Sequence, residues 1–177
     1  MRAFVLLPLL ILACQRPPET AGGPPGTCPA PTGDTSGWQT IDADAFTFRL
    51  PPGFERQDVQ AIDSRAETWR RGAAVVSFDM GWYSSDLRDS GGMYDDYQAC
   101  TENIGGRDAY LITAIINNPA DTAQHGRYVA AATWRDIPRP DSRDDTPVHL
   151  TIWTETADAA ARDEMLRVLR SVRFSGS

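Results

Sequence analysis

The chain has 177 residues, a length typical of one domain, with 41% apolar and 23% charged residues. Its 24 acidic residues outnumber 17 basic ones, all of them Arg, and the net charge is −7. Nucleic-acid-binding proteins usually present a basic face, so this balance argues against a nucleic acid as partner. No apolar run reaches the ~20 residues that a membrane-spanning helix needs.

The first predicted segment, residues 1–13, is typical of a signal peptide, because Arg2 is followed by an apolar run of eleven residues. The run ends in Ile11-Leu12-Ala13-Cys14, which resembles the bacterial lipobox, where the chain is cut before a Cys that carries acyl chains such as palmitate. We therefore predict that Cys14 is lipidated and anchors the chain to a membrane. An ordinary secretory signal with an incidental Cys is the alternative.

Gln15 follows the predicted lipidated Cys. In proteobacterial lipoproteins an Asp at this position favours retention in the inner membrane. The resemblance therefore implies a lipid-anchored protein of the cell envelope, with the outer membrane favoured over the inner one.

Residues 14–37 are predicted to be a disordered tether, because Pro and Gly dominate this stretch and few of its side chains are apolar. Such a stretch cannot bury enough apolar surface to offset the entropy lost on ordering. A single domain is expected at 38–175.

Alternation of apolar and polar residues predicts most elements of this domain as strands. In the strand at 73–82, Val76, Phe78, Met80 and Trp82 share the face expected to be buried. The strand at 110–116 is apolar on both faces and is expected near the centre of a sheet. The expected strands are 46–50, 67–70, 73–82, 110–116, 127–137 and 148–155.

Two helices are expected. Met93, Tyr97, Cys100 and Ile104 have helical spacing, and Gly105-Gly106 follows them as a stop signal. Asp158 is a candidate N-cap for a final helix. Short links between consecutive strands favour antiparallel pairing, so the fold class is α+β, with an antiparallel sheet packed against helices.

The segment Phe46-Thr47-Phe48-Arg49-Leu50-Pro51-Pro52-Gly53-Phe54 resembles the opening of PsbP-like domains, which can be written F-x-F-x-hydrophobic-P-x-G-aromatic. This resemblance implies an antiparallel sheet between helices over roughly residues 38–175. Many bacterial members of this superfamily are lipoproteins. It also implies binding or assembly functions and brings no catalytic motif, and a fold by itself implies no activity.

The residues that carry chemistry form no known catalytic or metal-binding motif. His125 and His149 lack metal-ligand spacing, and His125 is interpreted as a turn residue. The acidic segments starting at Asp86 and Asp141 lack the ligand positions of an EF-hand loop. We therefore expect no metal, no cofactor and no enzymatic activity.

Two cysteines remain if Cys14 is lipidated, and the cell envelope is oxidising. We predict a disulfide between Cys28 and Cys100, which would fix the tether to the helix expected at 93–104. The alternative is a free Cys28 with Cys100 as a small buried apolar residue.

A candidate contact surface lies on the strands at 127–137 and 148–155. Val148, Leu150 and Ile152 should face the core, which leaves Arg135, His149 and Trp153 together on the other face of the sheet. Trp and Arg are enriched in binding hot spots. The alternative is that a helix or the N-terminal segment covers Trp153 and makes a second core layer.

The leading hypothesis is a membrane-anchored envelope lipoprotein that acts as a non-catalytic binding or assembly module for an envelope protein. An envelope hydrolase without a recognisable motif and a small-ligand carrier with an exposed sheet face are the alternatives. A wide exposed apolar patch would favour the protein-binding hypothesis.

Overall fold

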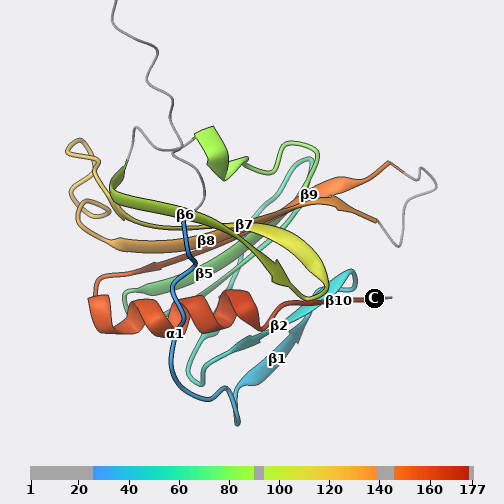
Figure 1. Cartoon of the computed structure of the whole chain (residues 1–177), viewed down its shortest axis with the longest axis horizontal. Coiled ribbons are helices and arrows are strands. Elements are labelled where there is room, and N and C mark those ends of the chain that lie inside the picture. Colours follow the sequence, from blue (N-terminus) through green and yellow to red (C-terminus); the bar gives the residue numbers. More distant parts are fainter. Residues whose placement is uncertain (1–25, 90–93, 139–145, 176–177) are drawn as a thin grey trace, which may run out of the picture.

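Two antiparallel sheets and one α-helix make up the described part of the chain, residues 26–89, 94–138 and 146–175, in the computed structural model (Figure 1). The larger sheet has the strand order β3-β4-β5-β9-β8-β7-β6, and the smaller has the order β1-β2-β10. The predicted signal peptide and Cys14 lie outside the described residues. The elements are β1 (Gln39–Asp42), β2 (Phe46–Leu50), β3 (Glu55–Gln57), β4 (Arg65–Arg71), β5 (Ala74–Gly81), the short 3₁₀ helix η1 (Leu87–Asp89), β6 (Tyr94–Ile104), β7 (Arg107–Ile116), β8 (Tyr128–Ile137), β9 (Val148–Thr156), α1 (Ala159–Arg170) and β10 (Arg173–Phe174).

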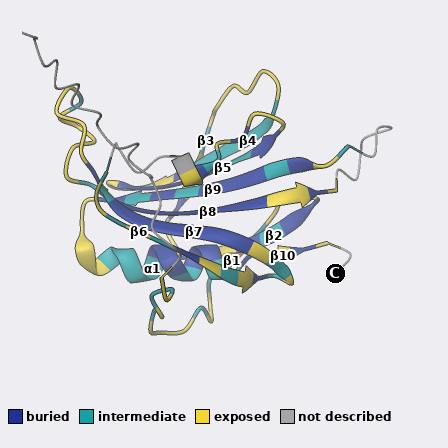
Figure 2. Ribbon diagram, turned by 45° about the horizontal axis from the view of Figure 1, so that its top comes forward, coloured by how far each residue is buried: buried dark blue, intermediate teal, exposed yellow. Residues whose placement is uncertain are grey.

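The main core fills the space between one face of the large sheet and a layer made of α1 and the small sheet (Figures 1 and 2). Strand β2 shows why the smaller sheet forms, because Phe46, Phe48 and Leu50 are buried while Arg49 between them is exposed. The Phe46 ring meets Phe78 of β5 edge-on, with 5.1 Å between their centroids. The two sheets are therefore joined by aromatic packing.

Helix α1 begins where the sequence predicts, because the Asp158 carboxylate accepts a hydrogen bond from the backbone N–H of Ala160 at 2.8 Å. Its apolar face, which includes Met165 and Leu169, is buried against the sheets. The domain combines sheet and helix as expected, but sheet dominates, and α1 is the only α-helix in the described ranges.

The helix predicted at 93–104 is wrong, because residues 94–104 form the edge strand β6. The strand contains a β-bulge between Asp95 and Gln98, and Asp96 adopts a φ of 49°. The helical spacing instead combines both faces of the strand, because Cys100 and Ile104 pack into the main core while Tyr97 packs on the opposite face of the sheet. Gly105 and Gly106 both have positive φ and form the tight hairpin turn to β7, not a helix stop.

Two further expectations need correction. Trp82 is exposed rather than part of the core, because β5 ends at Gly81 and the chain leaves the sheet there. Strand β7 lies next to the edge strand β6, and β9 occupies the centre. The apolar character of β7 has a different cause: Leu111 packs into the main core, while Ile112 packs into a second cluster on the opposite face.

Candidate functional site

The sheet face opposite α1, called the outer face here, carries the three residues predicted as a contact surface. The register confirms the predicted faces, because Trp153 pairs with Ala131 and Leu150 with Trp134. Trp153 and His149 are partly buried on β9, and Arg135 is exposed within the irregular stretch of β8 between Trp134 and Ile137. The four-residue spacing from His149 to Trp153 corresponds to roughly 13 Å along a strand, so one small ligand would not touch both.

Residues 82–89, which follow β5, lie over this face and separate Arg135 from Trp153. The Ser84 hydroxyl is 2.8 Å from the Thr151 hydroxyl, and the Ser85 carbonyl accepts hydrogen bonds from Thr151 and Thr133. Leu87 is fully buried in the second apolar cluster, with Ile112 and Val129 among its members. Arg135 forms an ion pair with Asp86 of the same segment. The outer face therefore has a local second core.

Trp153 lies at the margin of this second core and lines a cavity of about 380 Å³. Its indole N–H donates to Glu155 at 2.8 Å, and its ring lies 6.1 Å from the ring of Tyr94. Burial raises the pKa of Tyr94, with a smaller contribution from the charge of Glu155. The cavity lining is Val59, Ala66, Thr68, Ser77, Phe78, Asp79, Ser85, Leu87, Tyr94, Thr151 and Trp153.

One polar atom in this cavity has no partner among the described residues. It is Oδ1 of Asp79, which is shielded from solvent and accepts no hydrogen bond there. Buried acceptors in proteins are nearly always bonded, so this oxygen is an exception that the described residues leave without a donor.

Four large apolar side chains on the loops that follow β3 and β5 are exposed to solvent. Their exposed fractions are 43% for Val59, 93% for Ile62, 54% for Trp82 and 87% for Tyr83. The two loops that carry them meet, because a Cβ atom added to Gly81 would lie 2.7 Å from the Cβ of Ser64. Val59 belongs to both the cavity and this group. We call Val59, Ile62, Trp82 and Tyr83 the apolar patch.

Comparison with solved structures finds the same architecture in another protein. The solution structure of cyanobacterial PsbP (CyanoP) from Synechocystis sp. PCC 6803 superposes with a TM-score of 0.51. The alignment covers 86% of this chain and 100% of the other, with 16% sequence identity. The domain has a PsbP-like fold. At this identity the likeness concerns the fold alone, and no protein-family model and no curated protein matches the chain.

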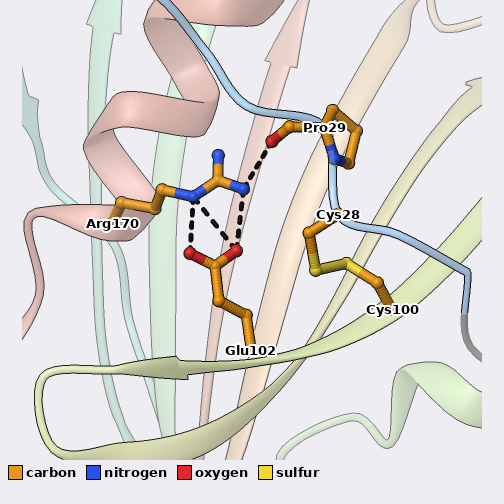
Figure 3. The surroundings of a disulfide bond; sticks show 5 residues. All are labelled: Cys28, Pro29, Cys100, Glu102 and Arg170. Carbon is orange, nitrogen blue, oxygen red and sulfur yellow. Dashed lines mark hydrogen bonds and ion pairs between the residues drawn. A yellow bond between two sulfur atoms is a disulfide. The ribbon is translucent and has the colours of Figure 1, made fainter.

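Cys28 and Cys100 of the PsbP-like domain form a disulfide, with 5.3 Å between their Cα atoms (Figure 3). The bond joins the N-terminal segment to strand β6, whereas the sequence interpretation placed Cys100 on a helix. Next to the disulfide, Arg170 of α1 donates to Glu102 of β6 at 2.7–3.1 Å and to the carbonyl of Pro29 (Figure 3). The disulfide and the hydrogen bond from Arg170 to Pro29 both fix the N-terminal segment against the domain.

The apolar patch of the PsbP-like domain was missed by the sequence interpretation. Trp82 and Tyr83 could have been recognised from the sequence. They are two bulky residues directly after Gly81, where the strand ends and a turn normally has polar residues. Within the described residues, no group of three His, Cys, Asp or Glu side chains is arranged to hold a metal ion. In the same part of the chain, no helix is long and apolar enough to cross a membrane.

Proposed function

We propose that this protein is a non-catalytic binding module of the bacterial cell envelope, anchored by lipid on Cys14, that binds a protein partner through the apolar patch and the Trp153 cavity. The observation that carries the proposal is the exposure of Ile62, Trp82 and Tyr83 together beside a preformed cavity. Contiguous exposed apolar side chains are unfavourable in water and typically mark interaction surfaces.

The lining of the cavity defines the chemistry of the partner. A cavity of about 380 Å³ accommodates one large apolar or aromatic side chain. Asp79 Oδ1 adds a single acceptor to this otherwise mainly apolar and hydroxyl-bearing lining. The partner should therefore present an apolar anchor next to a hydrogen-bond donor, in the way that binding hot spots combine a buried anchor with a few polar contacts.

Site-specific photocrosslinking in intact cells tests this function. A photoreactive amino acid in place of Tyr83 should give one dominant protein adduct, and Ile62→Ser with Trp82→Ser should abolish it without lowering the melting temperature. The matched control is the same photoreactive group at Ala160, which is exposed on α1. Identical adducts from positions 83 and 160, or none from 83, would refute the protein-binding function.

The lipid anchor is tested separately. Cys14→Ser should leave the chain uncleaved or soluble, because the modified thiol is lost. A variant that matures normally and still partitions into detergent like the wild type would show that the lipobox interpretation is wrong. Cell fractionation of the wild type then distinguishes the outer membrane, favoured by Gln15, from the inner membrane.

A second candidate function is a carrier of a small apolar ligand, favoured by the same cavity. A ligand that fills the cavity would make no use of Ile62 and Tyr83, which lie outside its lining. Serine substitutions at these two positions would then leave ligand binding unchanged, whereas protein binding would be lost.

A further inference from the structure

A second and larger cavity lies on the opposite side of the domain from the apolar patch. Its volume is about 840 Å³, and its walls come from the N-terminal segment 26–35, from β1, β2 and β6 and from the last turn of α1 with the residues after it. The lining residues are Gly26, Thr27, Cys28, Ala30, Pro31, Thr35, Thr40, Thr47, Arg49, Thr101, Glu102, Arg167, Arg170, Ser171 and Arg173. An adjoining hollow of about 490 Å³ shares Glu102, Arg170 and Arg173 with it.

The charge of this cavity is opposite to that of the chain. Four Arg and one Glu line it, and Arg170 is paired with that Glu102. Arg49, Arg167 and Arg173 have no carboxylate partner at hydrogen-bond distance among the described residues, which leaves a formal charge of +3 in a chain of net charge −7. The negative end of the α1 dipole offsets only about half a charge.

The neighbours of these three arginines leave much of their donor capacity free. Arg167 donates to the backbone carbonyls of Asp34 and Asp163, and its guanidinium lies 5.3 Å from the centre of the Trp38 ring. Arg173 donates only to backbone carbonyls, and Arg49 has a long 3.5 Å contact with the Thr35 hydroxyl. Hydrogen bonds that Ser36 donates to the Asp34 carboxylate lower the pKa of Asp34, and the nearby charge of Arg49 lowers it to a smaller extent.

The wall of the cavity is preorganised. Cys28 is covalently bonded to Cys100, and the Gly26 N–H donates to the Ala99 carbonyl at 2.8 Å. Gly33 has a φ of +110°, which favours glycine, and a side chain there would collide with the Arg167 guanidinium. An anion entering this site would therefore meet the guanidinium groups of Arg167 and Arg170 already held by their neighbours, which reduces the ordering cost of binding.

We propose that this cavity, the arginine cavity, binds the phosphate group of an anionic ligand. Guanidinium groups bind phosphate oxygens through paired N–H donors, and five Thr add hydroxyl groups to the lining. Such a phosphate could belong to an anionic phospholipid headgroup or to a soluble phosphorylated molecule. The chemistry at the arginines is the same in both cases.

Native mass spectrometry of the full chain in a neutral detergent tests the proposal with two probes. Phosphatidylglycerol is the lipid probe, with phosphatidylcholine of the same acyl chains as its control, and glycerol 1-phosphate is the soluble probe. The test variant is Arg49→Gln with Arg173→Gln, because both side chains are exposed and neither has a described ion pair. The control is Arg56→Gln with Arg135→Gln, which removes the same charge from exposed positions outside the cavity.

The wild type and the control should each retain one phosphatidylglycerol or one glycerol 1-phosphate per chain, and the test variant should bind at least about tenfold more weakly. Retention of both probes identifies the phosphate itself as the ligand group, and retention of phosphatidylglycerol alone identifies a lipid headgroup. No binding of either probe, equal retention of phosphatidylcholine, or equal binding by the test variant would overturn the proposal.

Discussion

Breaking the Cys28–Cys100 disulfide should destabilise the domain strongly, because the bond closes a long loop. The two cysteines are 72 residues apart in sequence. In the chain-entropy model, closing a loop of that length removes unfolded-state entropy worth roughly 4 kcal/mol at 25 °C. The entropy of unfolding is about 2.1 cal/mol/K per residue, and the domain has roughly 140 residues. Dividing the loss of roughly 4 kcal/mol by this total entropy gives a fall of roughly 14 °C in Tm.

Urea unfolding followed by tryptophan fluorescence, with and without reductant, measures this loss directly. Reduction is the cleaner perturbation, because Cys100 is buried and a substitution there would add the cost of a small cavity. The slope of the free energy of unfolding against urea should also rise, since the unlinked unfolded chain exposes more surface. Cys28→Ala with Cys100→Ala is the control and should not respond to reductant.

A difference below about 1 kcal/mol between oxidised and reduced protein would refute the loop-closure reasoning. Two reactive thiols in denatured protein that has not been reduced would refute the disulfide itself. Peptide mapping without reductant should show the peptides of Cys28 and Cys100 linked.

Three further outcomes are expected. Trp134→Ala, at a fully buried position, should lower the free energy of unfolding by about 3–5 kcal/mol. Trp153→Ala should lower it by less than about 2 kcal/mol, because the Trp153 ring is partly exposed. Equal losses in urea unfolding would show that Trp153 is an ordinary core residue. Asp158→Ala should cost about 1 kcal/mol, and Asp158→Asn should restore most of it, as calorimetry can check. Burial, and to a smaller extent the hydrogen bond with Tyr110, raises the pKa of Tyr97, so the folded state keeps a proton that the unfolded state loses at high pH. The free energy of unfolding should therefore fall as the pH rises above about 10. An equally steep fall in the Tyr97→Phe variant would contradict this.

The elements that could be predicted from sequence are those whose signals are local. The alternation in Phe46–Leu50 and the N-cap at Asp158 depend on neighbouring residues, and the structure confirms both. The pattern in β6 misled because it combines side chains from both faces of the strand, with Tyr97 on one face and Cys100 and Ile104 on the other. Local patterns also missed the small strands β1, β3 and β10, which are short and depend on their partners.

The outer face and the arginine cavity also differ in how much of each could be predicted from local sequence. The register of β8 against β9 could be predicted, so the shared face of His149 and Trp153 followed from alternation alone. The position of residues 82–89 over part of this face could not be predicted. No local sequence signal indicates that Leu87 packs into the second apolar cluster. The arginine cavity combines Arg49 with Arg167, Arg170 and Arg173, which are more than a hundred residues away in sequence. Only the tertiary fold brings these charges together.

The disulfide would also determine how the domain bears mechanical load from the proposed lipid anchor on Cys14. If Cys14 is held in a membrane as proposed, a pulling force on the N-terminal chain would reach the hydrogen bond from Gly26 to Ala99 and then Cys28, and would pass through the sulfur atoms into Cys100 of β6. The hydrogen-bonded ladder between β6 and β7 then resists the pull, and the short strand β1 carries none of it. In a reducing environment the same force would peel away residues 26–37 first, and the walls of the arginine cavity with them.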